Sequence, residues 1–141
     1  MSKTNESKLY ALLKKHLKDV HFTRIESHTE NGIPDVNACY NGKDIWVELK
    51  ANNSKDLGLS KWQIVWIMKR LKVGGTVFII NRPLLQRALK IYSGSIVREP
   101  ITSDTEPLAT FNEPIDWIAL KDLLFTAGEP RTSDKSRPTS A

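Results

Sequence analysis

The stretch PDVNACYNGKDIWVELK, residues 34–50, decides the fold of this chain. It contains two runs typical of β-strands, residues 35–40 and 43–50, separated only by Asn41 and Gly42. Both of these residues tolerate the positive φ angles of a type I′ turn. The stretch therefore predicts a β-hairpin with a two-residue turn, and this turn fixes the register of the two strands.

The predicted register places two acidic residues side by side. Because the numbers of facing residues have a constant sum in a hairpin, Asp35 lies opposite Glu48, with Cβ atoms about 5 Å apart. Lys50 projects from the same side, about 7 Å further along the strand. The other side of the hairpin is apolar and is expected to pack against a helix; it carries Pro34, Val36, Ala38, Ile45, Val47 and Leu49.

Two carboxylates that face each other on a sheet repel, so this pair requires an explanation. A bound divalent cation is one explanation. Asp35, Glu48 and the backbone carbonyl of Leu49 form an oxygen site suited to Mg²⁺ or Mn²⁺ rather than to Zn²⁺. The other explanation is a solvated hairpin whose acids are balanced by Lys43 and Lys50. The hairpin geometry alone favours neither of them.

The composition is that of an ordinary globular domain. The chain has 141 residues, of which 40% are hydrophobic and 26% charged, so one domain can bury a core without a structural metal or disulfide. Cys39 is the only cysteine, which excludes an intramolecular disulfide and favours a reducing compartment. Its side chain is expected to pack as a small apolar group. The polar N-terminus does not resemble a signal peptide, and no apolar run has the length of a membrane span. We therefore expect a soluble, cytoplasmic protein.

The charge balance points to a polyanionic partner. Lys and Arg outnumber Asp and Glu by 21 to 16, which gives a net charge of +5 and a sequence pI near 9.4. The three histidines have no metal-ligand spacing, and Gly74-Gly75 lacks the lysine and hydroxyl of a phosphate-binding loop. Neither a metal site built from histidines nor a phosphate-binding loop is therefore indicated.

Hydrophobic periodicity and turn signals predict the remaining elements. The expected helices cover residues 4–19 and 60–72, the stretch between Pro83 and Gly94, and residues 114–125; the expected further strands cover residues 21–28 and 76–81. Residues 100–114 are expected to be a loop and residues 127–141 a disordered tail. The order predicts an α/β fold with one mixed sheet in a single domain, residues 1–126. Its core lies at about 4–82, and a mainly helical extension follows at 83–126.

Two short motifs carry a family resemblance. Pro34-Asp35 followed by Glu48-Leu49-Lys50 resembles the PD-(D/E)xK motif of nucleases, and the predicted order of elements resembles the αβββαβ core of that superfamily. With the surrounding stretches GIPD (32–35), VELK (47–50) and DLGLS (56–60) and with Gln63, the chain resembles the virus-type replication-repair nuclease (VRR-NUC) family. The resemblance covers about residues 6–80, and the extension from residue 83 onward matches no part of the motif.

The resemblance implies roles for residues of the hairpin and of the helix that follows. Asp35 and Glu48 would bind one or two divalent cations, Lys50 would orient or activate the attacking water, and Gln63 would support the site. An acid on the first helix often completes such a site, and Glu6 is the candidate because it shares the apolar face of that helix at its N-terminal end. The alternative for Glu6 is an acid that complements the helix dipole.

Basic side chains outside this site are candidates for contacts with the DNA backbone. Trp62 and Trp66 lie beside some of them on the second helix, an arrangement that suits stacking on DNA, a protein interface or the edge of the core. The candidates are Lys14, Lys15, Lys55, Lys61, Lys69 and Arg70.

Together these residues predict a metal-dependent endonuclease that hydrolyses DNA phosphodiester bonds with Mg²⁺, for which Mn²⁺ can substitute. Small stand-alone members of the resembled family are similar to Holliday-junction resolvases. This implies a homodimer that cuts four-way junctions in DNA recombination and repair, in the cytoplasm of a bacterium or of a virus-infected cell. The last helix offers either a dimer surface or a cover for the sheet. The alternatives are a nuclease for flaps, nicks or single strands, and a DNA-binding accessory protein that does not cut.

Overall fold

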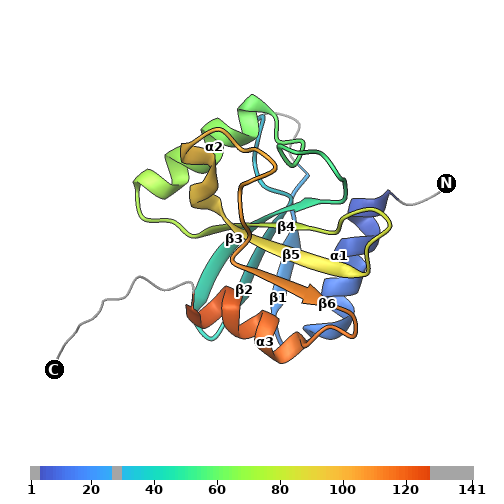
Figure 1. Cartoon of the computed structure of the whole chain (residues 1–141). Helices are drawn as coiled ribbons and strands as arrows, with labels where there is room; N and C mark the ends of the chain where they lie inside the picture. The colour runs from blue at the N-terminus through green and yellow to red at the C-terminus, as the bar shows by residue number, and fades with distance from the viewer. Residues whose placement is uncertain (1–3, 27–29, 128–141) are drawn as a thin grey trace, which may run out of the picture.

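The computed structural model describes residues 4–26 and 30–127. One six-stranded sheet carries the fold, and its strands lie in the order of the sequence (Figure 1). Strands β3 and β4 are parallel, and the other neighbouring strands of this sheet are antiparallel. The strands are β1 (His21–Arg24), β2 (Val36–Tyr40), β3 (Lys43–Lys50), β4 (Val77–Asn81), β5 (Ala88–Ser93) and β6 (Ala109–Asn112). This mixed sheet confirms the predicted α/β class.

Helices flank the sheet on both faces. They are α1 (Asn5–His16), α2 (Lys61–Lys72), α3 (Trp117–Asp122), the 3-10 helix η1 (Gly94–Arg98) and the π-helix η2 (Leu123–Ala127). The Thr4 side chain accepts a hydrogen bond from the Ser7 N–H and so begins α1 at the predicted place. The helix ends at His16, before the predicted end at residue 19. Within the described residues, no helix is long and apolar enough to cross a membrane.

The hairpin forms as predicted. Asn41 and Gly42 have φ angles of 53° and 77°, the positive values that a type I′ turn requires. Facing residues keep the predicted sum, because Val36 pairs with Val47. One step further along the same register, Asp35 faces Glu48 just before β2 begins.

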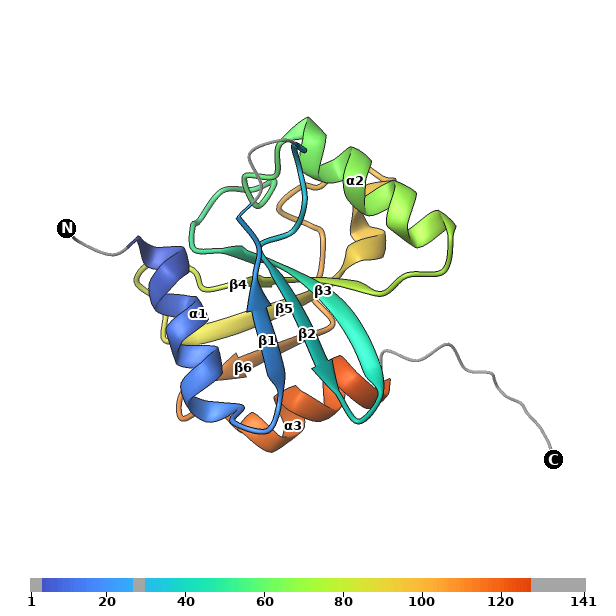
Figure 2. The same cartoon turned by 180° about the vertical axis from the view of Figure 1, so that it is seen from behind.

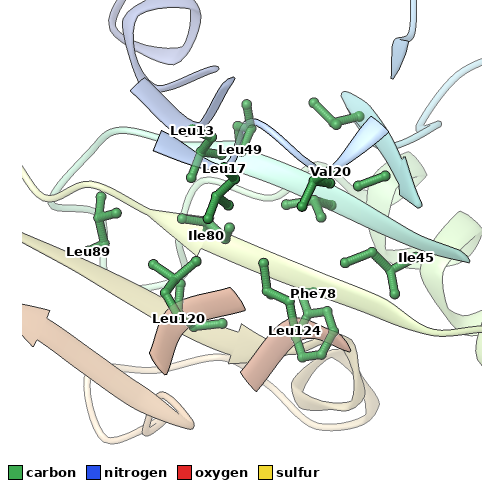
Figure 3. Close-up of a cluster of buried hydrophobic side chains, with 14 of the residues drawn as sticks. Leu13, Leu17, Val20, Ile45, Leu49, Phe78, Ile80, Leu89, Leu120 and Leu124 are labelled. Atoms are coloured by element: carbon green, nitrogen blue, oxygen red, sulfur yellow. The ribbon is translucent and has the colours of Figure 1, made fainter. Parts of the chain in front are cut away.

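The sheet has a hydrophobic core on each face. One core packs α1, α3 and η2 against the sheet, and Figure 3 shows Leu13 and Leu17 beside Ile80, with Leu120 below. The other core lies under α2 and η1 and is formed by Leu57, Ile67, Val77, Ile79, Tyr92 and Val97. Full burial of one such side chain stabilises the fold by roughly 1.5–3 kcal/mol.

Alternation along β3 assigns its side chains to these two cores. Val47 and Leu49 belong to the core with α1, so Glu48 and Lys50 face the side of α2. Figure 2 shows α1 and α2 on different sides of the strands. The hairpin acids and the second helix therefore meet on one face.

The expected helix between Pro83 and Gly94 is wrong. The second half of this stretch forms β5, which pairs antiparallel with β4. All residues of β4 are buried, and without β5 its backbone groups would have no partners on that edge. Leu89 and Ile91 point into one core and Tyr92 into the other, which is the period of a strand.

The expected loop at residues 100–114 is wrong in part, because it contains β6, which pairs with β5. The extension is therefore mixed, since it adds two strands to the sheet as well as helices. The last helix begins at Trp117, where the Asp116 carboxylate accepts a hydrogen bond from the Ala119 N–H at 3.0 Å. The predicted tail from residue 128 onward, and residues 27 and 28 of the first expected strand, lie outside the described residues.

The last helix covers the sheet, which was one of its two predicted roles. Leu120 of α3 and Leu124 and Phe125 of η2 are buried in the core shared with α1. The other role, a dimer surface, stays a prediction.

Candidate active site

Asp35 holds the backbone of β3 at the open end of the hairpin. It directly precedes β2, and its Oδ2 accepts a hydrogen bond from the Leu49 N–H at 2.9 Å. Its carbonyl accepts a second bond from the Ile25 N–H at 2.8 Å. The carboxylate is therefore fixed beside β3, next to Glu48.

Extended two residues beyond its last pair, Val36 with Val47, the hairpin register puts Pro34 opposite Leu49. Successive residues of a strand direct their backbone groups to opposite edges, and the Lys50 carbonyl accepts from the Arg82 N–H at 2.9 Å on the β4 side. The Leu49 carbonyl consequently points toward β2. The facing residue there is Pro34, which has no N–H to donate. A backbone oxygen is thus available at the same end of β3 as the two carboxylates.

Glu48 is a buried acid with one unpaired oxygen. The residue is only 2% exposed. Its Oε2 accepts a hydrogen bond from Gln63 Nε2 at 2.8 Å and lies 3.5 Å from Lys50 Nζ. Its Oε1 is buried and has no hydrogen-bond partner in the part of the chain that the structure describes. Burial, and after it the charge of Asp35, raise the pKa of Glu48 from 4.5 to about 8, so the carboxyl favours its neutral form at pH 7.

Lys50 lies between the acids and the start of α2. Its Nζ donates to the Gly58 carbonyl and to Gln63 Oε1, each at 3.2 Å, and the ion pair with Glu48 is its third contact. An ammonium group has three N–H donors, so these contacts use its full capacity. The side chain is 12% exposed, which leaves the ammonium accessible at the edge of the site.

Gln63 connects the N-terminus of α2 to the acids. Its Oε1 accepts from the Ser60 N–H at 2.8 Å, while its own N–H donates to Ser60 Oγ at 3.1 Å. This reciprocal pair is a capping box. Because Gln63 Nε2 donates to Glu48, the same side chain begins the helix and orients the buried acid.

Gly32 allows the loop before Asp35 to lie against the first turn of α2. Its φ angle is +86°, which favours glycine, and a Cβ at this position would overlap with the backbone carbonyl of Trp62. The GIPD stretch and α2 are therefore in direct contact. This contact keeps Asp35 on the same side as Gln63.

The donor set at this place fits a hard divalent cation. Two carboxylates and a backbone carbonyl are the oxygen ligands that Mg²⁺ and Mn²⁺ prefer. A cation would give the buried Glu48 Oε1 the partner that it lacks in the described structure. It would also favour the ionised carboxylate over the neutral one.

Glu6 is not brought into this group. In residues 4–26 and 30–127, no three or more His, Cys, Asp and Glu side chains are grouped so that they could hold a metal ion. Glu6 is half-buried on α1, whose Leu9 and Leu13 pack in the core on the other face of the sheet. A third acid is not required, because Mg²⁺ commonly keeps water and substrate phosphate as ligands beside one or two carboxylates. The role of Glu6 stays a prediction.

The basic residues expected to contact DNA lie at different distances from the site. Lys55 and Lys61 are exposed, in the loop after β3 and in the first turn of α2. Lys61 Nζ lies 5.2 Å from the ring centre of Trp62, which is 52% exposed. Lys61 and Trp62 thus form an accessible basic and aromatic pair directly before Gln63, the residue that contacts Glu48.

Other predicted contacts are placed less favourably. Arg70 lies 4.5 Å from the ring centre of Trp66 and 5.2 Å from that of Trp46, so it packs at the edge of the second core. Lys14 and Lys15 are exposed in the last turn of α1, away from α2, and Lys69 is exposed on α2. Their role in DNA binding stays a prediction.

Sequence reasoning missed Asn81 and Asn52. Asn81 is 4% exposed at the end of β4 and pairs with Lys50 in the sheet. Its side chain accepts from the Asn52 N–H at 3.1 Å and donates to the Asn52 carbonyl at 3.0 Å. These bonds fix the chain where it leaves Lys50. The signal in the sequence was a lone asparagine at the end of an otherwise apolar strand.

Comparison with known proteins finds a likeness of fold among solved structures. No protein-family model matches the chain, and no curated protein matches it. Among solved structures, the chain is similar to Hjc from Archaeoglobus fulgidus, described as a Holliday junction resolvase from an archaeal hyperthermophile. The match has a TM-score of 0.49 and 17% sequence identity, and it covers 77% of this chain and 86% of that chain. A likeness of this size carries no conclusion about activity, and the resemblance to the VRR-NUC family stays a prediction.

Proposed function

We propose that this protein is a metal-dependent DNA endonuclease of the PD-(D/E)xK type, and that its substrate is branched DNA of the four-way-junction kind. The observation that carries the proposal is the pairing of half-buried Asp35 with buried Glu48, whose Oε1 has no partner among the described residues and whose Oε2 lies 3.5 Å from Lys50 Nζ. A solvated hairpin, the alternative explanation of the two acids, does not account for a glutamate that is only 2% exposed.

The site residues suit phosphodiester hydrolysis. Asp35, Glu48 and the Leu49 carbonyl would hold Mg²⁺, with Mn²⁺ as a substitute. When bound, such a cation polarises the phosphoryl oxygen and lowers the pKa of a coordinated water. Lys50 can exchange one of its protein acceptors for a phosphate oxygen and so stabilise the negative charge that develops there. Gln63 keeps Glu48 in position throughout.

The proposed DNA structure is supported by the charge of the protein and by the family resemblance, and not by the geometry of the acids. The net charge of +5 and the exposed Lys55 and Lys61 support a nucleic-acid substrate. The preference for four-way junctions follows from the VRR-NUC resemblance, and with it a homodimer whose two sites make paired incisions in DNA recombination or repair. Sedimentation of the protein on a junction tests the dimer, because a single bound copy contradicts paired incision.

Cleavage of a labelled four-way junction tests the proposal. The wild type and Glu48→Ala are compared in Mg²⁺, Mn²⁺ and EDTA, with linear duplex, flap and single-stranded DNA as controls. We expect symmetric cuts in the junction that require the metal and are absent in the variant. Cleavage of flaps or single strands alone would agree with the proposed hydrolysis and contradict the four-way junction as the substrate. Tight binding of the junction without cleavage in either metal points instead to a non-catalytic accessory protein.

Gln63→Ala and Ser60→Ala separate the two roles of the α2 cap. Each variant removes one half of the capping box, so each is expected to lower the free energy of unfolding by about 1 kcal/mol. Only Gln63→Ala also removes the bond to Glu48, so only this variant is expected to lose most of the cleavage rate. Urea unfolding and single-turnover cleavage measure the two effects. Equal losses of cleavage in both variants would show that Gln63 acts only through the helix.

A further inference from the structure

The loop between β4 and β5, residues 82–87, exposes two neighbouring leucines. Leu84 is 43% exposed and Leu85 is fully exposed. Leu85 also has a φ angle of 64°, a conformation that residues with a branched side chain rarely adopt. Neither burial nor a relaxed backbone explains a leucine at this position. The two side chains are therefore candidates for contact with another molecule.

This loop is held in place by side chains of other segments. Asn53 Nδ2 donates to the Leu84 carbonyl at 3.3 Å, and the Leu84 N–H donates to Asn53 Oδ1 at 2.9 Å. At the end of the loop, Arg87 Nε donates to Glu113 Oε1 at 2.9 Å, and the Glu113 N–H donates to the Arg87 carbonyl at 2.9 Å. Arg82 lies 3.9 Å from the same carboxylate. The leucines are thus presented by an ordered loop.

The loop begins at the candidate active site. The Arg82 N–H donates to the Lys50 carbonyl at 2.9 Å, and Asn53 follows Lys50 by only three residues. Figure 2 shows the loop that joins β4 to β5 beside the start of α1. The leucine loop therefore adjoins the end of β3 that carries Lys50.

A hollow lies on each side of the loop, and basic side chains line both. One hollow, of about 390 Å³, is lined by residues that include Lys55, Pro83 and Lys90. The other, of about 340 Å³, is lined by residues that include Lys8, Arg82 and Arg87. Glu113 neutralises part of the charge of the two arginines, and the remaining cations suit phosphate groups on both sides of the leucines.

We propose that Leu84 and Leu85 form an apolar wedge that inserts at the branch point of the DNA and unstacks the bases there, with the diverging strands held in the two hollows. This inference rests on the proposed function, because it assumes branched DNA at the same site. Apolar side chains that enter a duplex separate neighbouring base steps. Bases at a branch point are easier to unstack than bases inside a continuous duplex, so a wedge favours branched over linear DNA.

The test uses a four-way junction that carries 2-aminopurine next to the branch point. The fluorescence of this base rises when it is unstacked, and Ca²⁺ in place of Mg²⁺ keeps chemistry out of the measurement. Leu85→Asn removes the apolar side chain, and asparagine accepts a positive φ angle, so the fold is retained. Leu108→Asn is the matched control, since Leu108 is a 53% exposed leucine just before β6, outside both hollows and outside α3.

We expect the wild type and Leu108→Asn to raise the fluorescence and Leu85→Asn to leave it unchanged. The affinity of Leu85→Asn for the junction is expected to fall about tenfold, as for the loss of one leucine contact, with unchanged affinity for linear duplex. The wedge is overturned if the bound wild type leaves the base stacked, if Leu85→Asn unstacks it equally well, or if the junction is not bound.

Two further results distinguish the wedge from a dimer interface and from the proposed nuclease activity. A change of the free protein from dimer to monomer in Leu85→Asn overturns the wedge and assigns the leucines to an interface between two copies. Absence of cleavage in Mg²⁺ and Mn²⁺, with normal unstacking in Ca²⁺, overturns the nuclease and supports the wedge.

Discussion

Glu48→Gln is expected to stabilise the metal-free protein as the pH rises from 5 to 8, relative to the wild type. Burial and Asp35 raise the pKa of Glu48 in the folded protein from 4.5 to about 8. Between these two values the folded protein holds a proton that the unfolded chain has released, so the stability of the wild type falls as the pH rises. Glutamine has the size of the neutral acid and does not ionise. The difference in free energy of unfolding should therefore grow by roughly 3 kcal/mol from pH 5 to pH 8.

Urea unfolding in EDTA at several pH values between 5 and 8 measures this difference. Glu106→Gln, at an exposed glutamate, controls for the loss of one negative charge. The same comparison with Mg²⁺ adds a second readout, because a cation that binds the ionised carboxylate should raise the melting temperature of the wild type and not that of Glu48→Gln. A constant difference between the two proteins at every pH would contradict the prediction.

Lys50→Met is expected to lower the rate of DNA cleavage by a factor of roughly 10² to 10³ without unfolding the protein. Methionine keeps most of the volume of the lysine stem and loses the ammonium group that contacts Glu48, Gln63 and the Gly58 carbonyl. The reaction thereby loses the cation that faces the developing negative charge.

Single-turnover cleavage and DNA affinity, measured together, separate this effect from a loss of binding. Lys55→Met is the control, because Lys55 is an exposed lysine on the loop beside the site and would contact only the DNA backbone. The control should change affinity with little change in the rate of the bound complex. A Lys50→Met protein that cuts at the rate of the wild type would remove Lys50 from the mechanism.

The hairpin and its acid pair could be predicted because the information is local. Asn41-Gly42 selects one turn type, the turn fixes the register, and the register places Asp35 opposite Glu48. The role of Gln63 was predicted from the resemblance, and its bond to Glu48 agrees with that role. What the sequence did not reveal was the burial of Glu48, which depends on α2 packing above it.

The missed features depend on contacts between distant residues. The stretch from residue 83 to 94 has caps that suit a helix, and its strand is decided by the free edge of β4. Asn81 is explained by Asn52, which lies 29 residues earlier in the chain. Glu6 is half-buried on α1, and the sequence did not reveal that α1 covers the face of the sheet opposite α2.

Pro34 affects the proposed metal site because it lacks a backbone N–H. Nineteen of the twenty common amino acids would offer an N–H here and draw the Leu49 carbonyl into ordinary strand pairing. The missing donor thus leaves a lone pair of the Leu49 carbonyl for a cation, next to the Asp35 carboxylate that accepts a hydrogen bond from the Leu49 N–H. The proline of the motif would then be part of the chemistry of the site without ever touching the DNA.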